Sequence, residues 1–257
     1  MNRHWVLLRG LGRDKRHWGS FILKFQQAFK NDRVSAIDTC GNGNFAQQKS
    51  PLSILEYTEH CRQQLHGDNV YKNKQIKVHL VALSLGGMIA VDWAQRFPDE
   101  VLSLTLINSS IANFTPWHKR INLLVFARLL KTILSKKSPE ELEKSILQVS
   151  SNFPIQQSTL DCWHKYRCTQ GTSFVNLIRQ LIAAARFKAN KLPNIVPLVL
   201  SSKEDRLVSY IASEDIHRYL GGQLIIHPKA GHDLPLDDGD WVIQQIKRSS
   251  TCHKVVI

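Results

Sequence analysis

The chain has 257 residues, of which 43% are hydrophobic and 21% are charged, a composition typical of a soluble globular protein. This size suits one large domain or a domain with an insertion, and it excludes a small disulfide scaffold or a disordered tail. The formal net charge of +13 is unusual, because such basicity favours nucleic acid, an anionic membrane or an acidic partner. No zinc-finger spacing, RNP-like strand or dense basic arm accompanies the charge, so nucleic-acid binding is not expected.

The sequence carries no targeting or membrane-spanning signal. No run reaches the roughly 18 consecutive apolar residues of a membrane span, and the apolar stretch near the N-terminus ends at Arg9, too early for a secretory signal. The five cysteines are odd in number and lack a CxxC pair, which is typical of free thiols in a reducing compartment: Cys40, Cys61, Cys162, Cys168 and Cys252. We therefore expect a cytoplasmic protein without a metal site.

Six short apolar or β-branched runs predict strands, at residues 4–8, 33–37, 77–82, 102–107, 196–201 and 223–227. Several are apolar almost throughout, as in strands that are buried on both faces of a parallel sheet. Residues 54–65 and 88–97, which lie between the early strands, have helical spacing. The pattern predicts an α/β fold with a doubly wound, mostly parallel sheet of about six strands.

The alternation of strand and helix breaks in residues 112–191. This segment contains no convincing strand but has amphipathic helical stretches at residues 121–134, 139–149, 160–166 and 174–188. It holds 13 Lys or Arg against 4 Asp or Glu, so about +9 of the +13 charge is local to it. We interpret it as a basic helical insertion into a core formed by residues 1–111 and 192–257.

The strongest chemical signal is the run Val78-His79-Leu80-Val81-Ala82-Leu83-Ser84-Leu85-Gly86-Gly87-Met88. An apolar strand leads into a serine and then into a helix, and the residues two before and two after the serine are small. That pattern is typical of a nucleophile elbow, a sharp turn that exposes the serine hydroxyl at a helix N-terminus. Ser84 is therefore the candidate nucleophile.

A serine nucleophile requires a histidine base and an acid that orients it. His232 follows the last predicted strand on a loop, where its side chain can reach across the sheet edge to Ser84. Asp205, which follows the fifth strand, is the candidate acid, and its neighbour Glu204 is the alternative. The oxyanion would be bound by the backbone N–H groups of Leu85 and Leu11.

Together these segments resemble the α/β-hydrolase superfamily, and within it the small serine carboxylesterases similar to pimeloyl-acyl-carrier-protein methyl ester esterase. The matching pieces span nearly the whole core: residues 10–12, the loop at residues 38–43, the Ser84 elbow, residues 205–208 and residues 230–232. Residues 112–191 correspond in position to the cap of this superfamily. The resemblance implies a cofactor-free enzyme that hydrolyses a carboxylic ester or thioester.

The sequence departs from the superfamily pattern at three positions near the proposed site. Arg9 stands where relatives usually have a histidine, so the charge behind the oxyanion loop must differ. Cys40 replaces a usual proline, and Ser202 replaces a common glycine before the acid loop. None of these changes removes a catalytic group.

Two other functions remain open from the sequence. The same fold serves lyases and synthases of small carboxylates, and it can serve as a non-catalytic binding protein for an acidic partner. If the basic cap overhangs the entrance, the expected substrate is an anionic ester or one carried on an acidic acyl carrier protein. The alternative is a solvated basic surface without a partner.

Overall fold

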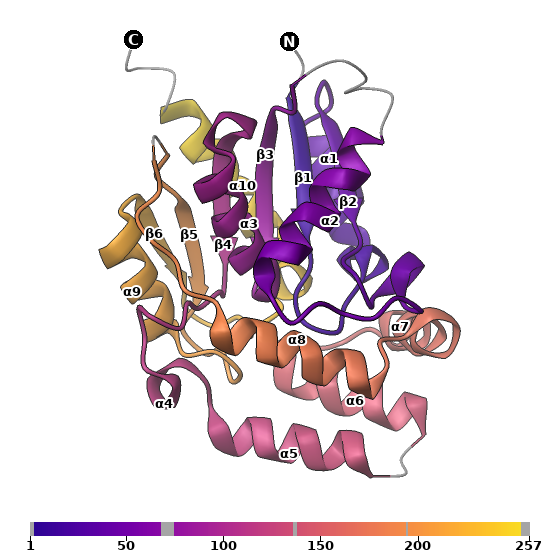
Figure 1. The fold of residues 1–257 in the computed structure, drawn as a ribbon. Coiled ribbons are helices and arrows are strands. Elements are labelled where there is room, and N and C mark those ends of the chain that lie inside the picture. The colour runs from indigo at the N-terminus through magenta and orange to yellow at the C-terminus, as the bar shows by residue number, and fades with distance from the viewer. Residues whose placement is uncertain (1–2, 68–74, 136–137, 194, 253–257) are drawn as a thin grey trace.

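A computed structural model describes residues 3–67, 75–135, 138–193 and 195–252 (Figure 1). The strands are β1 (His4–Leu8), β2 (Arg33–Ile37), β3 (Val78–Leu83), β4 (Val101–Ile107), β5 (Leu198–Ser202) and β6 (Gln223–His227). They form one sheet of six strands in the order β2-β1-β3-β4-β5-β6. Every neighbouring pair is parallel. The predicted α/β sheet is therefore confirmed, and it is parallel throughout.

The helices that cover the sheet come from the parts of the chain before and after residues 112–191. They are α1 (Ser20–Ala28), α2 (Ile54–His66), α3 (Leu85–Arg96), α9 (Tyr210–Leu220) and α10 (Leu234–Cys252), with short 3-10 turns at Lys15–Trp18, Gly43–Phe45 and Pro98–Glu100. Alternate residues of β1 separate two cores. Trp5 and Leu7 pack with α1 and α10, whereas Val6 and Leu8 pack with α2, α3 and α9. This two-sided burial explains why the strands are apolar almost throughout.

The sequence analysis did not predict α1, α9 and α10, and some predicted element boundaries differ from those of the structure. The fifth strand was expected from residue 196, but β5 begins at Leu198, after Pro197, since proline cannot donate a ladder hydrogen bond. The helix expected at residues 88–97 corresponds to α3, which begins earlier, at Leu85, directly after the sharp turn at Ser84. In the described part of the chain no helix is both long and apolar enough to cross a bilayer.

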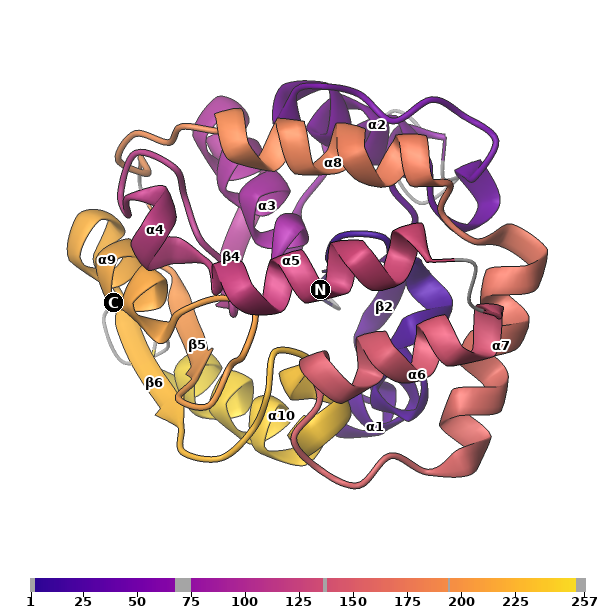
Figure 2. The same cartoon turned by 90° about the horizontal axis from the view of Figure 1, so that it is seen from below.

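Between β4 and β5 the described residues form five helices, which lie below the carboxyl edge of the sheet in Figure 1. They are α4 (Trp117–Arg120), α5 (Leu123–Leu134), α6 (Pro139–Ser150), α7 (Gln157–Gln170) and α8 (Phe174–Arg186). Seen from below in Figure 2, α5 runs across the front of the molecule. The helical character predicted for residues 112–191 is thus present. The division of the chain at residues 112 and 191 stays a prediction.

A buried charge cluster connects these helices to the core. Glu143 of α6 accepts hydrogen bonds from Arg13, on the loop after β1, at 2.8 Å and from Arg167 of α7 at 2.6 Å. The Arg13 guanidinium also lies over the Trp163 ring. Burial acts to raise the pKa of Glu143, but the positive charges of Arg13 and Arg167 outweigh it and the pKa is lowered. One carboxylate is therefore shared by two arginines at the junction and compensates half of their charge.

Replacing Glu143 with glutamine should destabilise the fold by about 3–5 kcal/mol, because two largely buried guanidinium groups lose their counter-charge. The exposed Glu140, in the first turn of the same helix, is the matched control, and Glu140→Gln should cost less than about 1 kcal/mol. Urea unfolding followed by circular dichroism measures both. Equal losses for the two variants would show that the junction does not depend on this charge.

Candidate active site

The loops that follow the strands bring the candidate residues to one edge of the sheet. Leu11 follows β1, Ser84 follows β3, Asp205 follows β5 and His232 follows β6. Because all strands are parallel, their carboxyl ends meet at the same edge, where α/β proteins bind their ligands.

Ser84 lies in a strained turn between β3 and α3. Its backbone angles, φ of 56° and ψ of -116°, lie in a region that residues other than glycine rarely adopt. The neighbours must be small for steric reasons. A Cβ atom on Gly86 would lie 2.5 Å from the carbonyl oxygen of Leu8, and one on Gly10 would lie 3.1 Å from Cβ of Ser84. The loop after β1 thus approaches the serine closely.

Asp205 and His232 are in direct contact. The Nδ1 atom of His232 lies 2.7 Å from Oδ2 of Asp205. The other carboxylate oxygen accepts hydrogen bonds from the backbone N–H groups of Leu207 and Val208 at 2.7 and 2.9 Å, which fixes the orientation of the carboxylate. Glu204 is exposed to solvent. Of the two acids considered from the sequence, the structure therefore pairs Asp205 with the histidine.

Two adjacent residues after β4, Asn108 and Ser109, connect the serine and histidine loops. The side chain of Asn108, which is buried and has a φ of 44°, donates to the carbonyl oxygen of His232 at 2.8 Å. The hydroxyl of Ser109 donates to the carbonyl oxygen of Ser84 at 2.8 Å. Sequence reasoning missed this clamp, although polar residues directly after a buried strand were a usable signal.

The Asn108 side chain also holds the loop that carries the acid. Its Oδ1 accepts a hydrogen bond from the backbone N–H of Ser202 at 2.8 Å, and its Nδ2 donates to the Ser202 hydroxyl at 3.0 Å. Ser202, which departs from the superfamily pattern, is thereby part of the hydrogen-bond network at the site.

Arg9 forms a buried ion pair with Asp233, the residue after His232. Its two terminal nitrogens donate to the two carboxylate oxygens at 3.0 and 2.6 Å. Burial acts to raise the pKa of Asp233, but the charge and hydrogen bonds of Arg9 outweigh it, so the pKa is lowered. The guanidinium also lies over the Trp18 ring. This pair ties the end of β1 to the histidine loop.

His232 is more basic than an ordinary histidine. Burial disfavours the charged imidazole, but the negative charge and hydrogen bond of Asp205 outweigh that effect, and Asp233 adds to them. The pKa of His232 is therefore raised above its ordinary value of 6.5. The positive charge of Arg9 acts in the opposite direction.

The two predicted oxyanion donors, the backbone N–H groups of Leu85 and Leu11, lie in segments whose backbone is held by a helix or by a hydrogen bond to a neighbouring residue. Leu85 is the first residue of α3, where an N–H has no acceptor within the helix. Beside Leu11, the N–H of Gly12 donates to Oε1 of Gln180 at 2.8 Å. Gln180 is fully buried on α8, and its amide nitrogen donates to Asn42 at 3.0 Å. A helix of the predicted cap thus supports the loop that carries Leu11, a contact that the sequence did not reveal.

A cavity of about 240 Å³ lies between this loop and the predicted cap. Leu11 and Gly12 form one wall. Helices α5, α6 and α8 form the other with apolar side chains, namely Leu129, Leu142, Ile146, Leu177 and Leu181. Arg13, Arg167 and Thr172 also line this cavity. A mostly apolar cavity beside a candidate oxyanion loop can hold the hydrocarbon part of a ligand.

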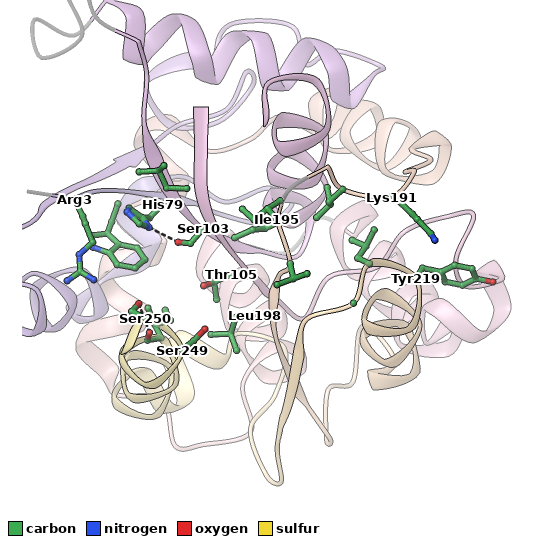
Figure 3. Close-up of a pocket in the computed structure, with 18 of the residues that line it drawn as sticks. Arg3, His79, Ser103, Thr105, Lys191, Ile195, Leu198, Tyr219, Ser249 and Ser250 are labelled. Atoms are coloured by element: carbon green, nitrogen blue, oxygen red, sulfur yellow. Dashed lines mark hydrogen bonds between the residues drawn. The ribbon is translucent and has the colours of Figure 1, made fainter. Parts of the chain in front are cut away.

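A second cavity, of about 810 Å³, lies at the opposite edge of the sheet (Figure 3). There β4 and β5 diverge, since the described pairing between them covers only Thr105–Ile107. His79 and Ser103 lie at its wall and are hydrogen-bonded at 2.7 Å. None of the candidate catalytic residues lines it. We do not assign it to the site, because ligands of parallel sheets bind at the carboxyl edge.

The fold is similar to those of several solved hydrolases. A protein assigned as a lipase (lip1) from Acinetobacter baumannii AYE superposes with a TM-score of 0.79 at 24% identity, over 97% of this chain and 84% of the other. A membrane phospholipase A described as a bacterial virulence factor superposes with a TM-score of 0.78 at 21% identity, over 99% of this chain and 80% of the other. The enol-lactonase from Burkholderia xenovorans LB400 superposes with a TM-score of 0.75 at 17% identity, over 98% of this chain and 92% of the other.

Sequence comparison identifies the family. No curated protein matches the chain significantly. Residues 25–239, which are most of the chain, match the family model described as serine aminopeptidase, S33. Together with the six-stranded parallel sheet, this match shows that the chain belongs to the S33 serine aminopeptidase family of α/β hydrolases.

Proposed function

We propose that the protein is a serine hydrolase that cleaves a carboxylic ester through an acyl-enzyme on Ser84. The contact of 2.7 Å between Asp205 and His232 carries the proposal, together with the Asn108–Ser109 clamp that links the histidine and serine loops. A serine in a strained elbow, a histidine and a buried carboxylate are the three groups that acyl transfer requires.

In the proposed mechanism, Nε2 of His232 accepts the proton of the Ser84 hydroxyl while the oxygen attacks the ester carbonyl. Asp205 keeps the other ring nitrogen protonated and stabilises the imidazolium. The N–H groups of Leu11 and Leu85 bind the oxyanion. The imidazolium then protonates the departing alcohol. In the second half-reaction His232 takes a proton from a water molecule as the water oxygen attacks the acyl carbonyl, and it returns that proton to the Ser84 oxygen as the bond to the acyl group breaks and the carboxylic acid leaves.

The acyl part of the substrate is proposed to occupy the cavity of about 240 Å³ beside Leu11. Its apolar lining suits a hydrocarbon chain better than a charged one. The two arginines at this cavity, Arg13 and Arg167, are both paired with Glu143. We accordingly propose residues 112–191 as the cap that encloses the acyl chain.

The bond that is cleaved is proposed to be an oxygen ester. The structural neighbours are assigned as a lipase, a phospholipase A and an enol-lactonase, and each of these names denotes an enzyme of ester bonds. Thioesters are the nearest alternative, because the same acyl-enzyme chemistry applies to them. The family name favours a second candidate, hydrolysis of an N-terminal peptide bond.

Replacing Ser84 with alanine should lower kcat for nitrophenyl esters by about 10³-fold or more without unfolding the protein, because only one hydroxyl group, on a half-buried side chain, is removed. Acyl thioesters and aminoacyl nitroanilides, assayed in parallel, rank the three substrate classes. Labelling by a fluorophosphonate should be lost with the hydroxyl. Full activity in the variant would reject Ser84, and turnover of the nitroanilides alone would favour the peptidase.

Filling the acyl cavity should change the preference for chain length. Ile146→Trp should lower kcat/KM for esters with acyl chains of about 8 to 12 carbons at least tenfold relative to acetyl esters, since the larger side chain occupies the space. Leu102→Trp, in the second cavity, is the matched control and should leave the ratio unchanged. The reverse pattern would move the acyl site to the second cavity.

The pH dependence should report the Asp205–His232 contact. Because the base must be neutral, kcat/KM should rise with pH, with a midpoint above 6.5, the ordinary pKa of histidine. Asp205→Asn should lower kcat by about 10⁴-fold and move the midpoint to lower pH, since the carboxylate that raises the pKa of His232 is gone. Glu204→Gln should change neither quantity. An unshifted midpoint in Asp205→Asn would contradict this assignment.

A further inference from the structure

Helices α4 and α5 carry large apolar side chains that are exposed to solvent. Trp117 is 65% exposed, Leu124 is 73% exposed and Leu134 is 63% exposed. The two helices lie at the end of the molecule opposite the termini, below α6 and α8 in Figure 1 and at the front in Figure 2. Exposed large apolar side chains that gather on one face indicate a contact surface, whereas scattered ones do not.

The same face is basic. Lys119, Arg128 and Lys131 are exposed, and among the residues that the structure describes none of them forms an ion pair or a side-chain hydrogen bond with an acid. The sequence from 112 to 139 contains six Lys or Arg and no Asp or Glu. We call the set Trp117, Lys119, Leu124, Arg128, Lys131 and Leu134 the outer cap face.

Charge on the outer cap face differs from charge at the acyl cavity. Arg13 and Arg167 at the cavity share one counter-charge, Glu143, which compensates one of their two positive charges. Exposed cations lie on α4 and α5, and also at Lys144, Lys165 and Arg186 on α6, α7 and α8. The basic character of the predicted cap is thus concentrated on its outside, next to exposed leucines.

Helix α5 joins this face to the candidate site. Leu129 lines the apolar cavity on the inner side of the helix, whereas Leu124, Arg128 and Lys131 are exposed on its outer side. A surface that contacts the outer cap face therefore lies one helix away from the space proposed for the acyl chain.

We propose that the outer cap face docks on an anionic lipid bilayer, and that membrane lipids supply the ester. Helices with leucine and tryptophan beside lysine and arginine bind at the bilayer interface, where apolar side chains enter the acyl boundary and cations meet anionic headgroups. A soluble acidic protein would use the cations but would not require exposed leucines. The docking stands on its own, whereas the lipid ester as substrate rests on the proposed function.

The test is sedimentation of the full-length protein with vesicles. Wild type should bind vesicles of phosphatidylcholine with about one third phosphatidylglycerol, bind phosphatidylcholine alone much more weakly, and dissociate as salt is raised. Ser84→Ala should bind equally well. Hydrolysis of a soluble acetyl ester, measured on every variant except Ser84→Ala, reports the integrity of the fold and of the site, and circular dichroism reports the fold of Ser84→Ala.

Two pairs of substitutions separate the components of binding. Arg128→Gln with Lys131→Gln should weaken binding to the anionic vesicles about 25-fold, since each cation near such a surface contributes about fivefold. Leu124→Ser with Leu134→Ser should weaken it about tenfold or more. The matched controls are Leu23→Ser with Leu55→Ser and Lys30→Gln with Lys229→Gln, which alter exposed residues elsewhere and should leave binding unchanged.

Several outcomes would overturn the docking. They are no binding by wild type, equal binding to neutral and anionic vesicles, or an equal loss in the matched controls. Binding of an acidic acyl carrier protein in place of vesicles would also overturn it and would identify the face as a protein interface. Vesicle binding without hydrolysis of any ester would contradict only the proposed function, and ester hydrolysis without vesicle binding would contradict only the docking.

Discussion

The ion pair between Arg9 and Asp233 is the contact on which the candidate site depends most. It joins two segments that are 224 positions apart in the chain, the end of β1 and the loop that carries His232. Both side chains are almost fully buried. Burying two charges costs free energy that their attraction only partly offsets. If either partner moved away, the other would be left as a buried charge without a counter-charge. The pair therefore fixes the arrangement of the loops more than it stabilises the fold.

The same pair sets the electrostatic environment of the histidine. Asp233 raises the pKa of His232 and Arg9 lowers it, so the two charges largely oppose each other there. The dominant neighbour is then Asp205, which contacts the ring directly. The counter-charge of Arg9, which follows His232 in the histidine loop, acts on the pKa of His232 in the direction opposite to that of Arg9.

A parallel arrangement governs the predicted cap. Glu143 pairs with both Arg13 and Arg167 at the junction with the core, and Gln180 accepts a hydrogen bond from the backbone N–H of Gly12, beside the candidate oxyanion donor Leu11. The inner side of this region is mostly apolar, as a hydrocarbon chain requires. Its remaining cations are confined to the outside. This separation makes one segment suited both to enclosing an acyl chain and to contacting an anionic surface.

Local patterns in the sequence were sufficient for the sheet, the helical insertion, the elbow at Ser84 and the positions of Asp205 and His232 after their strands. Each depends on periodicity or on steric limits within a few residues, which a sequence displays directly. The partner of Arg9, the clamp at Asn108 and the support from Gln180 depend on residues about 100 to 220 positions apart, and only the folded chain brings them together. The choice of Asp205 over Glu204 likewise required the structure, because adjacent carboxylates differ only in the direction in which the loop points them. The net charge was evident from composition, but which cations are neutralised and which face solvent is decided by burial and pairing in the tertiary structure.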